Sequence, residues 1–195
     1  GGGAAGATSL VSARVAIADA GAGDIEINGQ ALGKIDVTGG EDLEDVLANI
    51  NSNVDNIKAT GFNVLTAATI GSGVTGGTAA TGLSIVTTGM GATAATTFII
   101  SASSSMDELV ANINSETGGV VAASVNEDGK LVLSNDTGAS ISVEDDSTGQ
   151  GAGFTATATD YKGFLKLEST DGSAVRVEAG NKGLSSPGTA ADLLT

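Results

Sequence analysis

An internal repeat constrains the fold of this chain more than any other feature. Residues 45–52 (DVLANINS) match residues 108–115 (ELVANINS), 63 positions further on, with five of eight residues identical. In both copies the apolar residues recur at spacings of three and four, the period of an amphipathic helix. Each copy follows a short predicted strand, at 35–37 and at 98–101. The repeat therefore predicts two subdomains of similar design.

The two predicted helices begin at residues suited to capping. Asp42 is the expected N-cap of the first, and Ser105 opens the second with Glu108 three residues later, the spacing of a capping box. Gly118 and Gly119 are expected to end the second helix. The first helix is predicted to present Leu43, Val46, Leu47, Ile50, Val54 and Ile57 on one face, and the second Met106, Leu109, Val110 and Ile113.

The remaining segments predict short antiparallel strands. Apolar residues alternate with polar ones at 25–27, 131–133, 141–143, 165–167 and 175–177, and turn pairs such as Asn28-Gly29 bound most of these runs. A second echo relates 129–144 to 163–178 at an offset of 34 without a gap. We therefore expect an α+β fold: two small β-rich subdomains of antiparallel sheet, in series, each with one packed helix.

The chain divides into three parts on this interpretation. Residues 1–20 are expected to be a leading strand or linker toward a helical stalk, and 21–95 the first subdomain. The latter includes a Gly/Ala/Thr-rich insertion at 71–97, expected to form long exposed loops around one strand. Residues 96–195 are expected to form the second subdomain, with an additional hairpin at 163–178.

Composition excludes several kinds of chemistry. The chain has no His, no Cys and no Trp, so it holds no Ser-His or Cys-His nucleophile pair, no disulfide and no zinc site of the usual kind. Its 23 acidic and eight basic residues give a net charge of −15, which disfavours binding to nucleic acid or to anionic membranes. We expect no enzyme activity, no catalytic residue, no cofactor and no metal site.

Four motifs could indicate binding or modification, and each lacks a requirement or has a structural interpretation. Residues 71–76 carry the letters of a dinucleotide fingerprint, but no helix follows to receive a pyrophosphate. The loop around 126–129, aligned on the EF-hand glycine, lacks both essential carboxylates. Residues 144–146 are interpreted as a solvated acidic turn, and the sequon at 135–137 as a hairpin turn.

Three stretches together carry a family resemblance. Residues 24–29 (DIEING), 33–37 (GKIDV) and a helix that ends in Ala48–Asn51 resemble the "IN" motif of bacterial flagellins and hook-associated proteins. The second copy continues similarly through 118–124, 128–133 and 138–143. Residues 160–167 with Asp171-Gly172 resemble the closing part of the variable region in flagellins of Campylobacter and Helicobacter type. The resemblance covers residues 24–58 and 96–184.

The resemblance implies a structural protein: the solvent-exposed outer domain of a flagellin, the subunit of the extracellular filament used in motility, and a surface antigen. Its expected partners are other flagellin subunits, held through terminal helices that this chain lacks, and the isolated chain is expected to be monomeric. The opening Gly1-Gly2-Gly3 is expected to mark a cut where the filament-building part is missing.

Flagellins of this kind are often O-glycosylated, and the resemblance makes four residues candidates for this: Thr78, Thr81, Thr93 and Ser103. Two alternatives stay open. The chain could be the outer domain of a flagellar cap or hook-associated protein, which carry the same motif. It could also be an adhesin or glycan-binding surface module.

Overall fold

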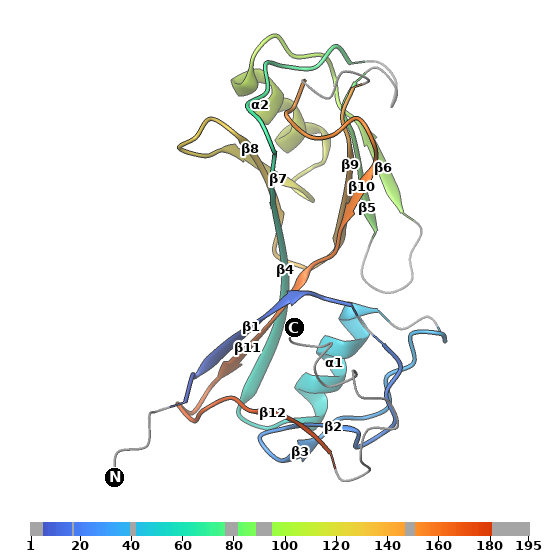
Figure 1. The fold of residues 1–195 in the computed structure, drawn as a ribbon, viewed down its shortest axis with the longest axis vertical. Coiled ribbons are helices and arrows are strands. Elements are labelled where there is room, and N and C mark those ends of the chain that lie inside the picture. The colour runs from blue at the N-terminus through green and yellow to red at the C-terminus, as the bar shows by residue number, and fades with distance from the viewer. Residues whose placement is uncertain are drawn as a thin grey trace. The chain divides into compact units, whose positions relative to one another are not determined.

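The computed structural model describes residues 6–16, 18–39, 42–76, 82–88, 95–146 and 151–180. These residues form two compact units, each with one helix and its own hydrophobic core. The first unit takes in the described residues up to Phe62 and from Gly163 onward, and the second runs from Asn63 to Lys162 (Figure 1). The second unit is therefore inserted between two segments of the first.

In the first unit, one helix and two antiparallel sheets enclose the core. The unit contains β1 (Ser9–Arg14), β2 (Ile25–Ile27), β3 (Gln30–Ala31), α1 (Leu43–Asn53), the first six residues of β4 (Ile57–Thr66), β11 (Phe164–Ser169) and β12 (Val177–Ala179). Strand β11 lies between β1 and the first half of β4, and β2 lies between β12 and β3.

The second unit repeats this plan with one additional strand. Besides the second half of β4, the unit contains β5 (Ser84–Thr88), β6 (Thr96–Ile99), α2 (Met106–Glu116), β7 (Ala122–Val125), β8 (Leu131–Asn135), β9 (Ser140–Glu144) and β10 (Thr159–Tyr161). Strand β8 lies between the second half of β4 and β7, while β9 and β5 are the inner strands of a sheet whose edges are β10 and β6.

Strand registers establish that the two units correspond. Ala59 faces Leu167 across β4 and β11, and Ala123 faces Leu133 across β7 and β8. Likewise, Val177 of β12 faces Ile27, and Val143 of β9 faces Ile85. In both cases the residues of the second echo, 34 positions apart, occupy the same place. The sequence repeat thus reflects one topology built twice.

The expected fold class is confirmed, but the units follow one another differently along the chain. The expected boundary near residue 95 falls inside the second unit, and 163–178 belongs to the first. Residues 9–14, within the expected leading strand or linker, form strand β1 and belong to the first unit's sheet. The reason is strand β4: its first half completes one unit and its second half begins the other, and no local pattern marks that change.

Several local expectations were wrong in instructive ways. Val54 and Ile57 are buried as the helical spacing predicts, but α1 ends at Asn53 and Ile57 begins β4. Residues 35–37 form only an isolated bridge, between Ile35 and Ala20, and β12 begins two residues after Val175. The apolar periodicity therefore predicted correctly that these side chains are buried, but it did not predict the backbone conformation.

The glycine-rich stretch was also predicted incorrectly in part. Strand β5 confirms the one expected strand. Residues 71–76, however, do not form an exposed loop: Val74 is 2% exposed, and the chain here bonds to Ser103 and to Gly151. A Cβ on Gly76 would lie 2.5 Å from the backbone nitrogen of Ala102, so a side chain cannot be accommodated there without a shift. Glycine in this segment permits close packing of backbone on backbone.

Candidate functional site: the repeated helix–strand junction

The two copies of the repeated sequence form the same contact. In the second unit, Asn114 accepts a hydrogen bond from the Ala123 N–H (2.8 Å) and donates one to the Ala123 carbonyl (3.0 Å). In the first, Asn51 makes the same pair of bonds with Ala59, again at 2.8 and 3.0 Å. An amide side chain carries a donor and an acceptor side by side, so it satisfies both backbone groups of one strand residue. Each asparagine thereby fastens its helix to the following strand.

A second asparagine in each helix binds the segment that precedes the helix. Asn49 accepts from the Gly33 N–H (2.8 Å) and donates to the carbonyls of Gly33 and Lys34. Asn112 donates to the carbonyl of Ala102 (3.2 Å). The isoleucine between the two asparagines is buried in both units. The Asn-Ile-Asn triplet therefore joins one helix to the chain on both sides of it and to the core.

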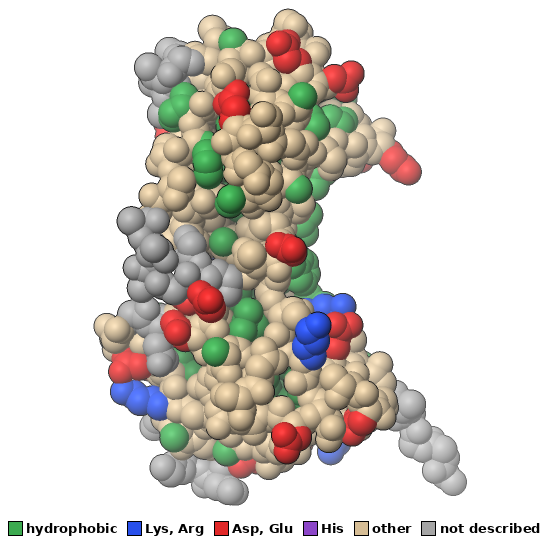
Figure 2. Space-filling model, turned by 180° about the vertical axis from the view of Figure 1, so that it is seen from behind, with side chains coloured by type: hydrophobic (Ala, Val, Ile, Leu, Met, Phe, Trp, Pro, Cys, Tyr) green, Lys and Arg blue, Asp and Glu red, His purple; other side chains and the backbone are tan. Residues whose placement is uncertain are grey.

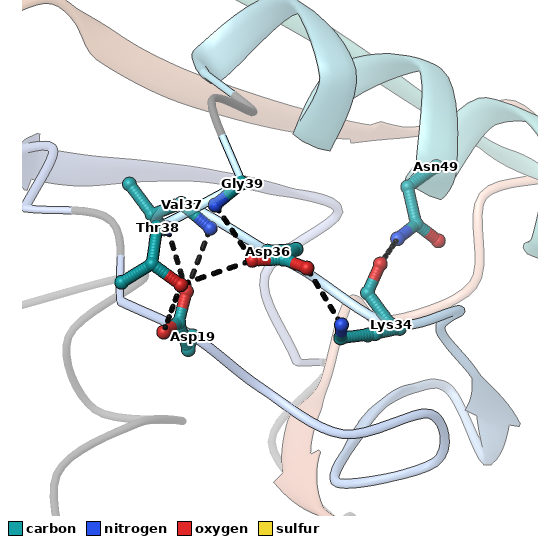
Figure 3. A network of polar contacts seen from close by, with 7 residues as sticks. All are labelled: Asp19, Lys34, Asp36, Val37, Thr38, Gly39 and Asn49. Atoms are coloured by element: carbon teal, nitrogen blue, oxygen red, sulfur yellow. Dashed lines mark hydrogen bonds and ion pairs between the residues drawn. The ribbon is translucent and has the colours of Figure 1, made fainter.

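In the first unit, this junction continues into a polar network in the loop before α1 (Figure 3). Asp19 accepts from the backbone N–H groups of Val37 (2.7 Å) and Thr38 (3.1 Å). Asp36 accepts from the Gly39 N–H (2.7 Å) and pairs with the Lys34 ammonium (2.6 Å). The Lys34 hydrogen bond, followed by the bonds from Gly39 and Thr38, lowers the pKa of Asp36. These carboxylates fix the loop backbone by accepting its otherwise unpaired donors.

Both helix caps use the expected residues, with one difference. The Asp42 side chain accepts from the N–H groups of Glu44 and Asp45, and the Asp45 side chain accepts from the Asp42 N–H, so the first helix has a full capping box. Ser105 accepts from the Glu108 N–H as predicted. The Glu108 carboxylate, however, binds the N–H and hydroxyl of Ser104 rather than the N-cap itself, and these bonds lower its pKa.

The acidic run after β9 is not the solvated turn that the sequence predicted. Asp145 is 1% exposed, and its carboxylate accepts hydrogen bonds from the N–H groups of Asp146, Ala152 and Phe154 at 2.9–3.2 Å. Burial raises the pKa of Asp145 against the opposing effect of these donors. The carboxylate organises the buried loop 151–154, so its role is structural.

Asn135, the asparagine of the sequon, also has a structural role. Asn135 donates to the Ala139 carbonyl (2.9 Å) and accepts from the Gly138 N–H (2.9 Å), so its amide closes the turn between β8 and β9. This agrees with its interpretation as a hairpin turn.

Of the four candidate O-glycosylation residues, the structure describes one. Ser103 is half-buried, its N–H donates to the Val74 carbonyl, and its hydroxyl oxygen accepts from the Val74 N–H, each at 2.9 Å. Thr78, Thr81 and Thr93 lie outside the described residues. Modification of these four residues stays a prediction.

Acidic residues predominate in both units. The described part of the first unit holds 11 acidic and five basic residues, and that of the second holds ten acidic and two basic. Figure 2 shows red acidic side chains spread over the view, with few blue ones between them. No three of the described carboxylates come together as a metal-binding group. Neither described helix is long and apolar enough to cross a bilayer.

The sequence of the second unit has a counterpart in a known family. Residues 82–137 match the family model of the flagellin hook IN motif. The matched stretch runs from two residues before β5 to the turn after β8, and it contains α2 with Asn112, Ile113 and Asn114. A search of curated proteins gave no match. The second unit thus carries a flagellin-related structural motif, over less than a third of the chain.

The structure shows a similar arrangement outside the matched residues. The first unit has the same registers and the same asparagine bonds, although the family model does not reach it. Sequence reasoning found both helices, but it missed the role of the asparagines. A signal for that role was present in the sequence. A solvated helix face requires polar residues but not the same two asparagines in both helices, so the recurrence of Asn-Ile-Asn indicates a specific contact.

Proposed function

We propose that this chain is the solvent-exposed outer domain of a flagellin, displayed on the surface of an extracellular flagellar filament. The observation that carries the proposal is the match of residues 82–137, in the second unit, to the flagellin hook IN motif. The bonds of Asn114 in that unit recur at Asn51 in the first unit. On this proposal the role is structural and antigenic, and the chain belongs to the Campylobacter- and Helicobacter-like type.

The surface chemistry supports display. Copies of a strongly acidic domain repel one another and other acidic cell surfaces, which keeps a dense array soluble. The exposed turns that join the strands tolerate sequence change at little cost in stability, which suits a varying antigenic surface. We extend the proposal to O-glycosylation of Ser and Thr, with Thr78, Thr81, Thr93 and Ser103 as the first residues to test.

The proposal also concerns assembly. Filament contacts would come from long terminal helices with apolar heptads, outside this chain, so the isolated chain is proposed to be monomeric at physiological salt. Sequencing the gene on both sides of the region tests this directly. Heptad-bearing helices like those of flagellin at both ends would support the proposal, and other flanking domains would contradict it.

The outer domain of a cap or hook-associated protein is the second candidate, because the matched motif is named for the hook. The sequences that flank the chain distinguish the two candidates, because they would resemble either the terminal helices of flagellin or those of a cap or hook-associated protein. A glycan-binding module is the third. A glycan array and thermal melting with millimolar calcium test that reading, and an unchanged melting temperature with no bound glycan would remove it.

A further inference from the structure

The outer face of one sheet in the first unit differs from the rest of this acidic chain. Strands β1, β11 and β4 turn one face toward the core, where Leu165, Leu167 and Ala59 are buried. The opposite side chains of these strands form what we call the basic face. Its nine residues follow from the strand registers: Ser9, Val11 and Arg14 on β1, Phe164, Lys166 and Glu168 on β11, and Lys58, Thr60 and Phe62 on β4.

The basic face concentrates positive charge. It holds three of the seven basic residues that the structure describes, and its one acidic residue is Glu168. Glu168 pairs with Lys166 (2.8 Å) and lies opposite Lys58 in the strand register. Lys166 is the main cause of the lowered pKa of Glu168, and Lys58 adds a smaller effect. One carboxylate thus serves two ammonium groups, which leaves a positive surplus on this face.

An aromatic pair adds apolar contact area beside these charges. The rings of Phe62 and Phe164 stack with centroids 5.1 Å apart, and the Arg14 guanidinium lies 4.6 Å from the centroid of the Phe164 ring. Both rings are half-buried, and Val11 is 52% exposed on the edge strand β1. Stacking holds the guanidinium in place, so the cation is already oriented before any partner arrives.

We infer that the basic face docks the acidic surface of the second unit of a neighbouring copy of this chain. Charge complementarity selects this occupant: the second unit has ten acidic and only two basic described residues, whereas the basic face has the opposite balance. Overall repulsion between copies does not prevent contact. At physiological salt, charges more than about 8 Å apart are largely screened, while groups in contact still attract one another.

The inference rests on the proposed function in one respect: a filament supplies the high local concentration that a small charged face requires. In solution, a chain concentration of about 1 mM takes the place of that local concentration, so contacts too weak to hold a dimer in dilute solution are still sampled. Equal amounts of unlabelled and ¹⁵N-labelled chain are treated with a carbodiimide, which couples lysine amines to carboxylates in contact, and the mixed-isotope cross-links are mapped by mass spectrometry. The internal Lys166–Glu168 pair serves as a positive control for coupling.

We expect mixed-isotope links to involve Lys58 and Lys166 more often than Lys130 and Lys162, the lysines of the second unit, and to join them to carboxylates of the second unit. Arg14→Ala should reduce these links about two- to fivefold without removing either amine. Arg176→Ala, which changes the net charge equally, should leave them unchanged. If Arg14→Ala does not fold, the inference is tested by the distribution of mixed-isotope links over the lysines of the unaltered chain.

Links spread evenly over all lysines, or an equal effect of both arginine variants, would overturn the inference. So would an absence of mixed-isotope links. If polygalacturonate instead shifts the amide resonances of the basic face while no such links form, the occupant is an anionic glycan and not a second copy. Failure of the filament proposal is detected separately, since these cross-links are measured without filaments.

Discussion

Replacing Asn114 by alanine tests the asparagine bond that defines the repeated junction. The change removes both hydrogen bonds to Ala123 and leaves the part-buried N–H and carbonyl of Ala123 without these partners. Both bonds are part-buried, so each of the two backbone groups left without its partner costs about 1–1.5 kcal/mol, near the lower end of the range for an unsatisfied buried group. The better helix propensity of alanine returns about 0.5 kcal/mol. We therefore expect the free energy of unfolding of the second unit to fall by about 2 kcal/mol.

The assay is urea unfolding followed by tyrosine fluorescence. The chain has one tyrosine, Tyr161, which lies in the second unit with its ring 6.4 Å from that of Phe154. The matched control is Ser115→Ala, an exposed neighbour on the same helix, which should change stability by less than about 0.5 kcal/mol. Equal effects of the Asn114 and Ser115 variants would refute the reasoning.

A second variant at Asn114 tests why the residue must be an amide. In Asn114→Asp, the carboxylate can accept from the Ala123 N–H but opposes its carbonyl oxygen, so the ionised form is disfavoured and the folded-state pKa is raised. The folded state then binds a proton more readily than the unfolded one. Stability should recover in part as pH falls through that raised pKa, and a loss that does not change with pH would contradict this account.

Three further predictions concern other parts of the fold. Gly153→Ala should destabilise the second unit by about 2 kcal/mol or more, because its φ is +88° and a Cβ would meet the Thr69 carbonyl; Gly172→Ala, at φ +82° in open space, should cost only about 1 kcal/mol in thermal melts. Leu133→Ala, fully buried, should lower the free energy of unfolding by about 2–5 kcal/mol in urea. Hydrogen bonds from Ser173 and Ser169 lower the pKa of Asp171 to about 2, so its contribution is full above about pH 4 and is lost as pH falls toward 2. Asp171→Asn should therefore melt earlier than the unaltered chain at neutral pH, with the difference shrinking over that range.

Local features of the fold could be predicted because they depend on neighbouring residues. Asp42 and Ser105 cap the helices as their side chains and spacing indicate, and Asn28 and Gly29 take the positive φ angles, 51° and 74°, of a tight turn. The end of α1 could not be predicted, because Ile57 continues the helical spacing although it begins a strand.

Features that depend on residues far apart in the chain could not be predicted from the sequence. The sharing of β4 between the units follows from its pairing with β11 and β8, which lie far along the chain. The sequence around Asp145 predicts a solvated carboxylate. Its burial depends on residues 152–154, which fold back over it and donate hydrogen bonds to the carboxylate. The Asn-Ile-Asn triplet was visible as a repeat, but its partners Ala59 and Ala123 are set by the strand that follows each helix.

Immunogold labelling of intact filaments tests the central claim most directly. Antibodies raised against residues 1–195 are applied to cells that produce the protein and carry flagella. If the chain is the outer domain of the filament subunit, gold particles should decorate the filament along its whole length. Label confined to the filament tip or to the hook junction, or filaments left unlabelled while the cell body is decorated, would contradict the account.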